Sequence, residues 1–209
     1  MFKVIRMVKR GDKLPGEFRQ EWLEHNRELR KAASKVAAGV TADAKVFADA
    51  PAFDGLACIY YSTSAEAAKA EDKSLGKGAV SLVAEERVLF ERPNVTLKTA
   101  GQLKVVVTAV RKKELSPAQF KDLALKAQSK VESKAIVESP IQKIVGSFTV
   151  PQPGETPPFD GMIELYFASA DDIKAAFGSP IIGMLRKDEE SYVQIDAPEI
   201  RLVIEEHVL

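Results

Sequence analysis

Cysteine and histidine are scarce in this sequence, which contains one cysteine and two histidines among 209 residues. The single cysteine, Cys58, excludes an internal disulfide and any metal site built from several thiolates. Two histidines also argue against a structural zinc site, which draws on His and Cys ligands. The sequence further lacks a Gly-rich phosphate loop, a nucleophile elbow and the usual spacing of metal ligands, so we expect neither a bound metal nor a bound cofactor.

Net charge is absent as well, because 30 Lys and Arg residues balance 30 Asp and Glu residues. The bulk charge therefore gives no reason to expect nucleic acid or an anionic membrane as a partner. No apolar run approaches the length of a membrane span, and residues 1–6 mix charged with apolar side chains instead of forming the apolar core of a signal peptide. We expect a cytoplasmic protein that binds neither nucleic acid nor membranes.

What the sequence does contain is a stretch that occurs twice. Phe53-Asp54-Gly55 and Phe159-Asp160-Gly161 each follow a proline-containing segment and precede a short apolar run, after which Ser or Thr opens a helical pattern. Pro and Asp-Gly are turn signals, the apolar run is typical of a strand, and Ser and Thr are favoured where helices begin. Each copy therefore predicts a turn, a strand and a helix.

The rest of the first half also alternates between strand and helix patterns. Residues 2–8 alternate as a strand does, which places Arg6 on the same face as Val4 and Val8. From Glu17 the periodicity is helical, and we expect this helix to run to about Ala38 and to end at Gly39. Its predicted buried stripe consists of Phe18, Trp22, His25 and Leu29. Short strands are expected near 44–48 and 95–97, and residues 79–88 have a mixed pattern.

The second half repeats this programme from Leu103 onward. Residues 103–110 predict a strand, and Ser116 with Gln119 fits a capping box at the start of a helix. The buried stripe of this helix is predicted at Phe120, Leu123, Ala124, Ala127 and Val131. A strand over 141–150, the second Phe-Asp-Gly unit, a helix over 171–177 and a closing strand over 200–208 follow.

Each half thus has the order strand, helix, strand, strand, helix, strand, which is the ferredoxin-like order. A sheet of this type carries its helices on one face and leaves an apolar face that needs cover. The predicted fold class is α+β, with two tandem βαββαβ repeats packed sheet to sheet as a pseudo-dimeric barrel. The expected domains are residues 1–101 and 102–209, with an enclosed space between the two sheets.

Several segments also carry a resemblance to a known family. In the first half they are Val8-Lys9-Arg10, the helix from Phe18 to His25, and Phe53-Asp54-Gly55. In the second half they are the run from Phe159 to Phe167, Gly178-Ser179-Pro180, Leu185, Asp188-Glu189 and the ending Glu205-Glu206-His207-Val208. In this order and spacing they resemble the EthD family of dimeric α/β-barrel proteins, as two tandem copies over nearly the whole chain.

The departures from the family pattern differ between the halves. Where the pattern has a Trp and a His in the first helix, the second half has Ala124 and Ala127, and where it closes on Glu-His-Val the first half has Ala100-Gly101-Gln102. Each half therefore keeps one of the two family histidines, which predicts one asymmetric polar site per chain. The resemblance implies a small hydrophobic ligand, because relatives of this barrel include enzymes that act on polyketides, lactones and other carbonyl compounds without a cofactor, and some that bind or degrade haem.

The two histidines are the first candidates for that site. A neutral imidazole such as His25 can act as a general base or acid near neutral pH, although a core histidine bonded to a backbone carbonyl would occupy the same position on the stripe. His207 lies between carboxylates near the end of the chain. It either guards a sheet edge, or lines the barrel mouth, where a neighbouring carboxylate would raise its pKa and make it a proton donor.

Charged residues on central strands are the second group of candidates. Arg6 and Glu164 belong to strands that the ferredoxin-like order places inside the sheet, where a charge must be paired or solvated. They form a structural ion pair or are exposed at a frayed rim of the sheet. Alternatively, they belong to a site in which Arg6 holds a carboxylate or enolate oxygen, Glu164 acts as base, and Tyr60 or Tyr166 donates a proton. Cys58, in the place that Glu164 has in the other half, is either a small core residue or a nucleophile.

Three functions are compatible with these residues. The first is a cofactor-independent isomerase, dehydratase or cyclase that acts on a small hydrophobic carbonyl compound in the cavity between the sheets. The second is a ligand-binding or stress-related protein without catalysis, so whether the chain is an enzyme stays open. The third, haem binding, requires His25 or His207 to reach the iron. The pseudo-dimer makes self-association unnecessary, and a homodimer of two such chains is left open.

Overall fold

The computed structural model describes residues 1–70, 75, 78–128 and 134–209. The strands are β1 Phe2–Val8, β2 Lys35–Thr41, β3 Gly55–Tyr61, β4 Val80–Glu91, β5 Ala100–Ala109, β6 Lys143–Thr149, β7 Gly161–Phe167 and β8 Arg201–Val208. The helices are α1 Pro15–Leu29, α2 Ser64–Lys69, α3 Pro117–Gln128, α4 Lys134–Glu138, α5 Ala170–Phe177 and α6 Pro180–Glu189. Within the described ranges, no helix has the length and apolar character to cross a membrane.

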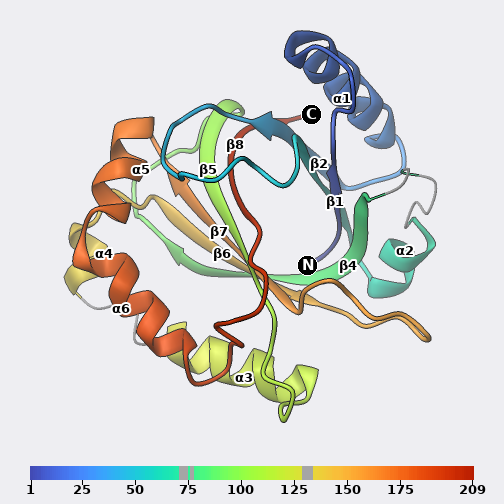
Figure 1. Cartoon of the computed structure of the whole chain (residues 1–209). Coiled ribbons are helices and arrows are strands. Elements are labelled where there is room, and N and C mark those ends of the chain that lie inside the picture. The colour runs from blue at the N-terminus through green and yellow to red at the C-terminus, as the bar shows by residue number, and fades with distance from the viewer. Residues whose placement is uncertain (71–74, 76–77, 129–133) are drawn as a thin grey trace.

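All eight strands form one closed antiparallel barrel in the order β1-β3-β2-β8-β5-β7-β6-β4. The four strands of the first half are contiguous in this order, as are the four of the second half, and the two groups meet where β2 pairs with β8 and β4 with β6. The helices lie outside, with α1 and α2 on one side and α3 to α6 on the other (Figure 1). The α+β class is confirmed, and hydrogen bonds at two seams join the sheets that we expected only to pack together.

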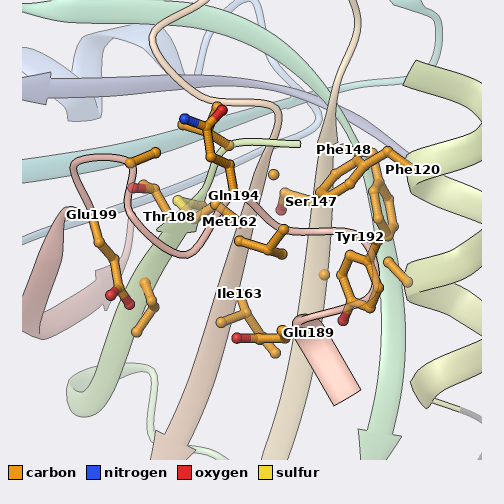
Figure 2. Close-up of a pocket in the computed structure, with 18 of the residues that line it drawn as sticks. Thr108, Phe120, Ser147, Phe148, Met162, Ile163, Glu189, Tyr192, Gln194 and Glu199 are labelled. Atoms are coloured by element: carbon orange, nitrogen blue, oxygen red, sulfur yellow. The ribbon is translucent and has the colours of Figure 1, made fainter. Parts of the chain in front are cut away.

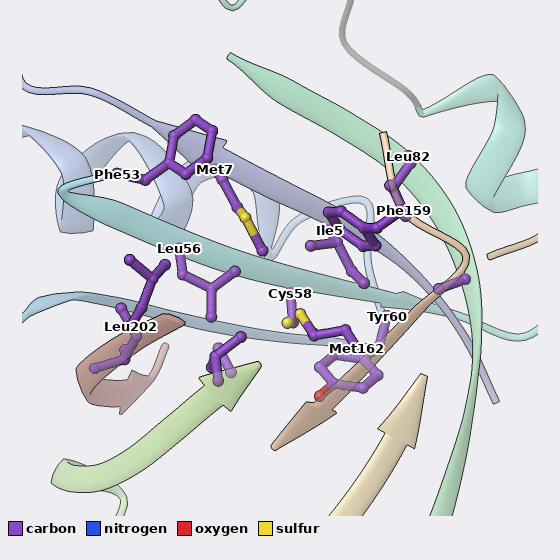
Figure 3. Packing of buried hydrophobic residues seen from close by; sticks show 14 residues of the cluster. Ile5, Met7, Phe53, Leu56, Cys58, Tyr60, Leu82, Phe159, Met162 and Leu202 are labelled. Carbon is purple, nitrogen blue, oxygen red and sulfur yellow. The ribbon is translucent and has the colours of Figure 1, made fainter. Parts of the chain in front are cut away.

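The barrel interior is filled by buried side chains from both halves. Its apolar part, seen in Figure 3, includes Ile5, Met7, Leu56, Cys58, Leu82, Met162 and Leu202. These residues alternate along their strands with residues that face the helices, as the period of two in a strand requires. The space that the sequence predicted as a cavity between the sheets is therefore largely occupied by core.

The first predicted helix proved too long, and the strand after it is misplaced. α1 ends at Leu29, and the alanine-rich segment that looked helical forms β2. Small residues are needed there because β2 packs closely along the β2–β8 seam. A Cβ added at Gly39 would lie 2.3 Å from the Glu205 carbonyl oxygen, so this glycine permits strand pairing and does not end the helix.

One further expectation was wrong, and the sequence patterns did not predict β4, α4 or α6. The segment with a mixed pattern forms the long strand β4, and the strand expected near 95–97 is absent from the structure of those residues. α6, which covers the second-half sheet, was not predicted. The strand at residues 2–8 and the capping box of Ser116 and Gln119 are confirmed, while Val131 of the predicted stripe lies outside the described residues.

The first Phe-Asp-Gly unit connects three layers of the structure. Phe53 lies in the barrel core, and the Asp54 carboxylate accepts a hydrogen bond of 3.0 Å from the Arg10 backbone N–H just beyond β1. Gly55 makes room for α1, because a Cβ there would lie 2.9 Å from the ring of Phe18. The unit thus fixes the end of β1, the start of β3 and the approach of α1.

The second unit makes the same contacts at the end of β5. Phe159 lies in the same core, and the Asp160 carboxylate accepts bonds of 2.9 Å from both the backbone N–H and the Nε of Arg111. A Cβ at Gly161 would lie 3.0 Å from the ring of Phe120 on α3. The repeated stretch therefore has one structural task in both halves.

Replacing Asp160 by asparagine should lower the free energy of unfolding by about 1–3 kcal/mol, because two hydrogen bonds lose their charged acceptor. The loss is measurable by chemical denaturation. Asp12→Asn, at an exposed position, is the matched control and should leave stability nearly unchanged. Equal effects of the two substitutions would contradict the role given to Asp160.

Candidate functional site

A chain of charged side chains crosses the barrel interior. Lys3 on β1 contacts Glu86 at 2.8 Å and Glu164 at 2.5 Å. Lys104 on β5 contacts Glu164 at 2.6 Å and forms a further ion pair with Glu206. Lys3, Lys104 and Glu164 are all buried, so Glu164 is a central carboxylate shared by two ammonium groups from different halves of the chain.

This pairing decides the charge of each group. Burial alone would raise the pKa of Glu164, but Lys104 and Lys3 outweigh it and lower the pKa to about 2. Burial opposes charge on both lysines, yet their carboxylate neighbours raise the pKa of Lys3 and of Lys104 well above the ordinary value. At neutral pH all three groups are ionised and satisfied, an arrangement suited to structure more than to proton transfer.

Three other predicted residues surround this chain. The Tyr166 hydroxyl donates to Glu164 at 3.4 Å, and the Lys3 ammonium lies 5.5 Å from the centre of the Tyr60 ring. Cys58 is fully buried, and burial raises the pKa of its thiol to about 12, which leaves little thiolate to act as a nucleophile. The structure thus brings Glu164, Tyr166, Tyr60 and Cys58 together in the barrel interior.

Arg6 and His25 lie elsewhere. Arg6 projects from the outer face of β1, where its Nη2 donates to the Ala70 carbonyl at the end of α2 at 3.0 Å. His25 is exposed, with its ring 6.2 Å from that of Trp22, and the buried position on that turn belongs to Asn26. Neither the core histidine nor the cavity histidine that we considered is therefore present at this position.

His207 belongs to a strand that is paired on both sides, so it does not guard a sheet edge. It lies on the outer face of β8, with its Nε2 2.9 Å from Arg19 Nη2 and 3.3 Å from the Glu205 carboxylate. Its neighbours are a guanidinium from α1 and a carboxylate from its own strand. The predicted polar residues therefore divide into an interior group and three outer residues, Arg6, His25 and His207.

A different site opens on the outer face of the second-half sheet, under α3 and α6 (Figure 2). Two adjoining hollows of about 70 and 160 Å³ share Val107, Ile163, Arg186, Glu189, Tyr192 and Glu199. Aromatic edges from Phe120, Phe148 and Tyr192 line one end, with the Phe120 and Tyr192 rings 5.7 Å apart. The walls are mainly apolar, and a few polar groups converge on them, as is typical of a ligand site.

The hollows lie where the second half departs from the first. In α1, Trp22 follows Phe18 by four residues and fills the space between the helix and the sheet. In α3, Phe120 keeps the role of Phe18, but Ala124 stands where Trp22 would be and lines the first hollow. Ala127, in the place of His25, lines the second. Ala124 therefore leaves open a space that Trp22 fills in the first half.

Glu189, the last residue of α6, is the most perturbed carboxyl group of this site. Burial in the apolar wall, reinforced by Glu199 and opposed by Arg186, raises the pKa of Glu189 to about 7. In the described part of the chain, no hydrogen-bond donor contacts its carboxylate. Arg186 and Arg201 donate instead to Glu199, at 2.5 and 2.7 Å. Glu189 is thus free to exchange a proton near neutral pH.

Tyr192 lies on the same wall, three residues beyond Glu189. Burial and the neighbouring carboxylates of Glu189 and Asp188 raise the pKa of its phenol, so the hydroxyl keeps its proton. The site therefore combines a carboxyl group that can change its protonation state with a hydroxyl that stays a donor. In the described ranges, no group of three or more His, Cys, Asp or Glu side chains is placed to hold a metal ion.

Lys3, Lys104 and the pair of Glu189 and Tyr192 were not among the site residues predicted from the sequence. Lys3 follows Phe2 and Lys104 follows Leu103 at the start of the two matching sequence patterns, and this recurrence is a signal that the repeat itself offered. Glu189 was noticed only as part of Asp188-Glu189 in the family resemblance. Its burial depends on how α6 packs, which no local pattern indicates.

Comparison with known proteins agrees with the fold. Residues 112–196, which contain α3, α6 and Glu189, match the family model described as EthD domain. Among solved structures, an anthrone oxidase-like protein aligns with a TM-score of 0.62 at 10% identity, over 99% of this chain and 92% of its own. A proposed monooxygenase from Lactobacillus acidophilus NCFM aligns at 0.55 and 10% identity, over 100% and 97%.

A further proposed monooxygenase, from Fusobacterium nucleatum subsp. nucleatum ATCC 25586, aligns with a TM-score of 0.56 at 9% identity, over 99% of this chain and 92% of its own. No curated protein matches the sequence. At such low identities these likenesses concern the fold alone. Residues 112–196 thus match the EthD domain model, and the chain shares the fold of an α+β barrel with these proteins.

Proposed function

We propose that the chain consists of two tandem βαββαβ copies, residues 1–101 and 102–209, which form the barrel together as a pseudo-dimer. Three observations support this division. The two halves have the same order of strands in the barrel, the same contacts around Phe-Asp-Gly, and lysines at the same register, since Lys3 pairs with Tyr60 as Lys104 pairs with Tyr166. One chain then provides both halves of the closed barrel.

We further propose that the protein is a cofactor-independent enzyme that acts on a small hydrophobic carbonyl compound in the hollow beneath α3 and α6. The observation that carries this proposal is the Glu189 carboxyl group, partly buried in an apolar wall and with its pKa raised to about 7. A carboxyl group titrating near the working pH is suited to general acid–base catalysis. This location replaces the space between the sheets, which core side chains occupy.

The chemistry would proceed as a proton transfer. The ionised Glu189 removes a proton from the carbon next to the substrate carbonyl, and negative charge develops on the carbonyl oxygen. The Tyr192 hydroxyl, which keeps its proton, donates a hydrogen bond to that oxygen. The protonated Glu189 then returns the proton to another position, which completes an isomerisation, or to a leaving hydroxyl, which completes a dehydration. The apolar wall excludes water from both steps.

An oxygenase is the second candidate, and the names of the neighbours favour it. Two aligned proteins are proposed monooxygenases and a third is an anthrone oxidase-like protein. Molecular oxygen would be the oxidant: removal of a proton next to a carbonyl leaves an enolate that O₂ can oxidise, so Glu189 would have the same first task. A binding protein without catalysis is the remaining alternative, and it predicts a ligand in the hollow with no chemical change.

Exchange of hydrogen for deuterium tests the proposal directly. The chain is incubated in D₂O with a panel of small cyclic ketones, and exchange at the carbon next to the carbonyl is followed by NMR. We expect exchange to accelerate as the pH rises through about 7, where Glu189 ionises. Ketones that bind without exchange would support the binding protein, and ketones that neither bind nor exchange would contradict the site.

Haem titration should give no red-shifted Soret band. Both histidines lie away from the hollow, with His25 exposed on α1 and His207 packed against Arg19. A haem protein needs an axial ligand that faces the binding space. An absorbance titration with haemin checks this expectation, and a saturable red-shifted band would overturn it.

A further inference from the structure

The first half contains a ring system bound in the place that is hollow in the second half. The Trp22 indole is buried between α1 and the sheet, and its Nε1–H donates to the Gly39 carbonyl at 3.1 Å. The ring lies against Gly55, where an added Cβ would be 3.0 Å from Nε1. It is also stacked on Phe18, with ring centres 6.1 Å apart and planes 11° apart. Burial between helix and sheet, a hydrogen bond, the close contact with Gly55 and stacking on Phe18 thus hold a flat bicyclic ring there.

Three of these features recur around the hollow, without the indole. Phe120 corresponds to Phe18, and Gly161 to Gly55, through their matching contacts. Strand register identifies the acceptor: Gly39 pairs with Leu56, the residue after Gly55, and Ser147 pairs with Met162, the residue after Gly161. Phe120, Ser147 and Gly161 all line the hollow, and Ala124 replaces the tryptophan. The binding surface for a ring is therefore kept while the ring is missing.

We infer that the hollow binds a flat, neutral bicyclic compound whose N–H or O–H donates to the Ser147 carbonyl oxygen, as Trp22 donates to Gly39. A carbonyl oxygen has two lone pairs, so a ladder hydrogen bond leaves one for a ligand. One further part of this inference rests on the proposed function: the same ligand also contains a carbonyl group, and the acidic C–H next to that carbonyl faces Glu189.

Size and charge agree with a neutral bicycle. An apolar protein cavity of about 150 Å³ holds one benzene ring. The two adjoining hollows, of about 70 and 160 Å³, therefore suit a somewhat larger ring system. Arg186 and Arg201 both donate to Glu199, so neither of these two guanidinium groups in the described wall lacks a carboxylate partner and is left to select a carboxylate or phosphate.

Oxindole and N-methyloxindole make a matched pair of probes. Both are flat bicycles with an acidic C–H next to a carbonyl, and only oxindole has an N–H. We expect calorimetry to show oxindole binding about two- to tenfold more tightly, which is the effect of one hydrogen bond. NMR should place the site, because the amide signals of Phe148 and Gly161 should shift in the unmodified chain.

A substitution that fills the hollow with a side chain provides a second test. Ala124→Trp should place an indole where Trp22 lies in the first half, so the variant should stay folded and lose measurable oxindole binding. Ala118→Trp adds the same side chain at an exposed position of α3 and should bind oxindole as the unmodified chain does. If Ala124→Trp unfolds, the affinities of oxindole and N-methyloxindole and the NMR shifts of the unmodified chain still test the inference.

The outcomes separate this inference from the proposed function. Equal affinity for the two probes, or unchanged oxindole binding in a folded Ala124→Trp variant, overturns the inference. The proposed function would survive that result if a flexible ketone such as 2-octanone still underwent exchange that depends on Glu189. Oxindole that binds selectively at Phe148 and Gly161 supports the inference, and oxindole exchange that is indifferent to Glu189 then contradicts the acid–base enzyme alone.

Discussion

Replacing Glu164 by alanine is expected to lower the free energy of unfolding by about 3–5 kcal/mol, because it removes a buried carboxylate that two buried ammonium groups share. Glu164 is shared by Lys3 and Lys104 at 2.5 and 2.6 Å, and all three side chains are almost inaccessible. The substitution would leave each lysine with a single carboxylate partner nearer the barrel rim. It would also remove a contact that joins the two halves of the chain.

The effect of Glu164 should depend on pH in one direction. The pairing lowers the pKa of Glu164 from 4.5 to about 2, so the folded state binds its proton less readily than the unfolded state does. Its contribution is therefore complete above pH 4.5 and disappears as the pH falls toward about 2. The difference in stability between the unmodified chain and Glu164→Ala should shrink over this range.

Chemical denaturation between neutral and acid pH measures both effects. Glu21→Ala, which removes an exposed ion pair with Lys13, is the matched control and should have a much smaller effect. If Glu164→Ala were no more destabilising than Glu21→Ala, the interior chain of charges would not stabilise the barrel. A difference that persisted unchanged to pH 2 would show that lost packing, not charge, is responsible.

The sequence predicted those features of the fold that recur in both halves. Two copies of Phe-Asp-Gly and two similar first strands indicated the order of elements, and this order leads to the α+β class. Which residues of α1 face the sheet was harder to predict, because the side chains of His25 and Asn26 are only about 100° apart around the helix axis. Asn26 follows Phe18 and Trp22 at intervals of four and is buried, with its amide donating to the Trp22 carbonyl at 2.8 Å.

The interior charges show why strand patterns alone were insufficient. Both faces of β1 are covered, one by helices and one by the barrel core, so alternation cannot tell which face is inside. Arg6 was assigned to the site and Lys3 was passed over, yet Lys3 faces Glu164 and Arg6 faces α2. Only closure of the barrel brings Lys3 and Lys104 to the same carboxylate.

The departures from the repeat were visible in the sequence, but their consequence was not. Ala124 and Ala127 stood out as substitutes for a tryptophan and a histidine, and we read them as the loss of a polar group. In the structure Ala124 is a loss of buried volume, because Trp22 fills the matching space in the first half. His25 is exposed there, so Ala127 only lines the second hollow. Whether such a space collapses or stays open depends on the packing of α6, a helix that the sequence analysis did not predict.

Replacing Glu189 by glutamine should reduce proton exchange in a bound ketone by about 10²–10⁴-fold, the contribution usual for a positioned general base. Glutamine keeps the size of the side chain and cannot accept the substrate proton as a carboxylate does. Glu190→Gln, at the adjacent exposed position, is the matched control and should exchange ketones like the unmodified chain. Equal losses in both variants, or in neither, would exclude Glu189 as the base.

Stability should change in the opposite sense to activity. Burial raises the pKa of Glu189 from 4.5 to about 7, so the folded state favours the protonated carboxyl and is destabilised as the pH rises between these values. Glutamine does not ionise. Glu189→Gln should therefore match the unmodified chain near pH 4 and be more stable above pH 7, as thermal unfolding across this range would show. The proposed role of Glu189 as a base would account for a carboxyl group that lowers stability in an apolar wall, because packing alone favours an uncharged side chain there.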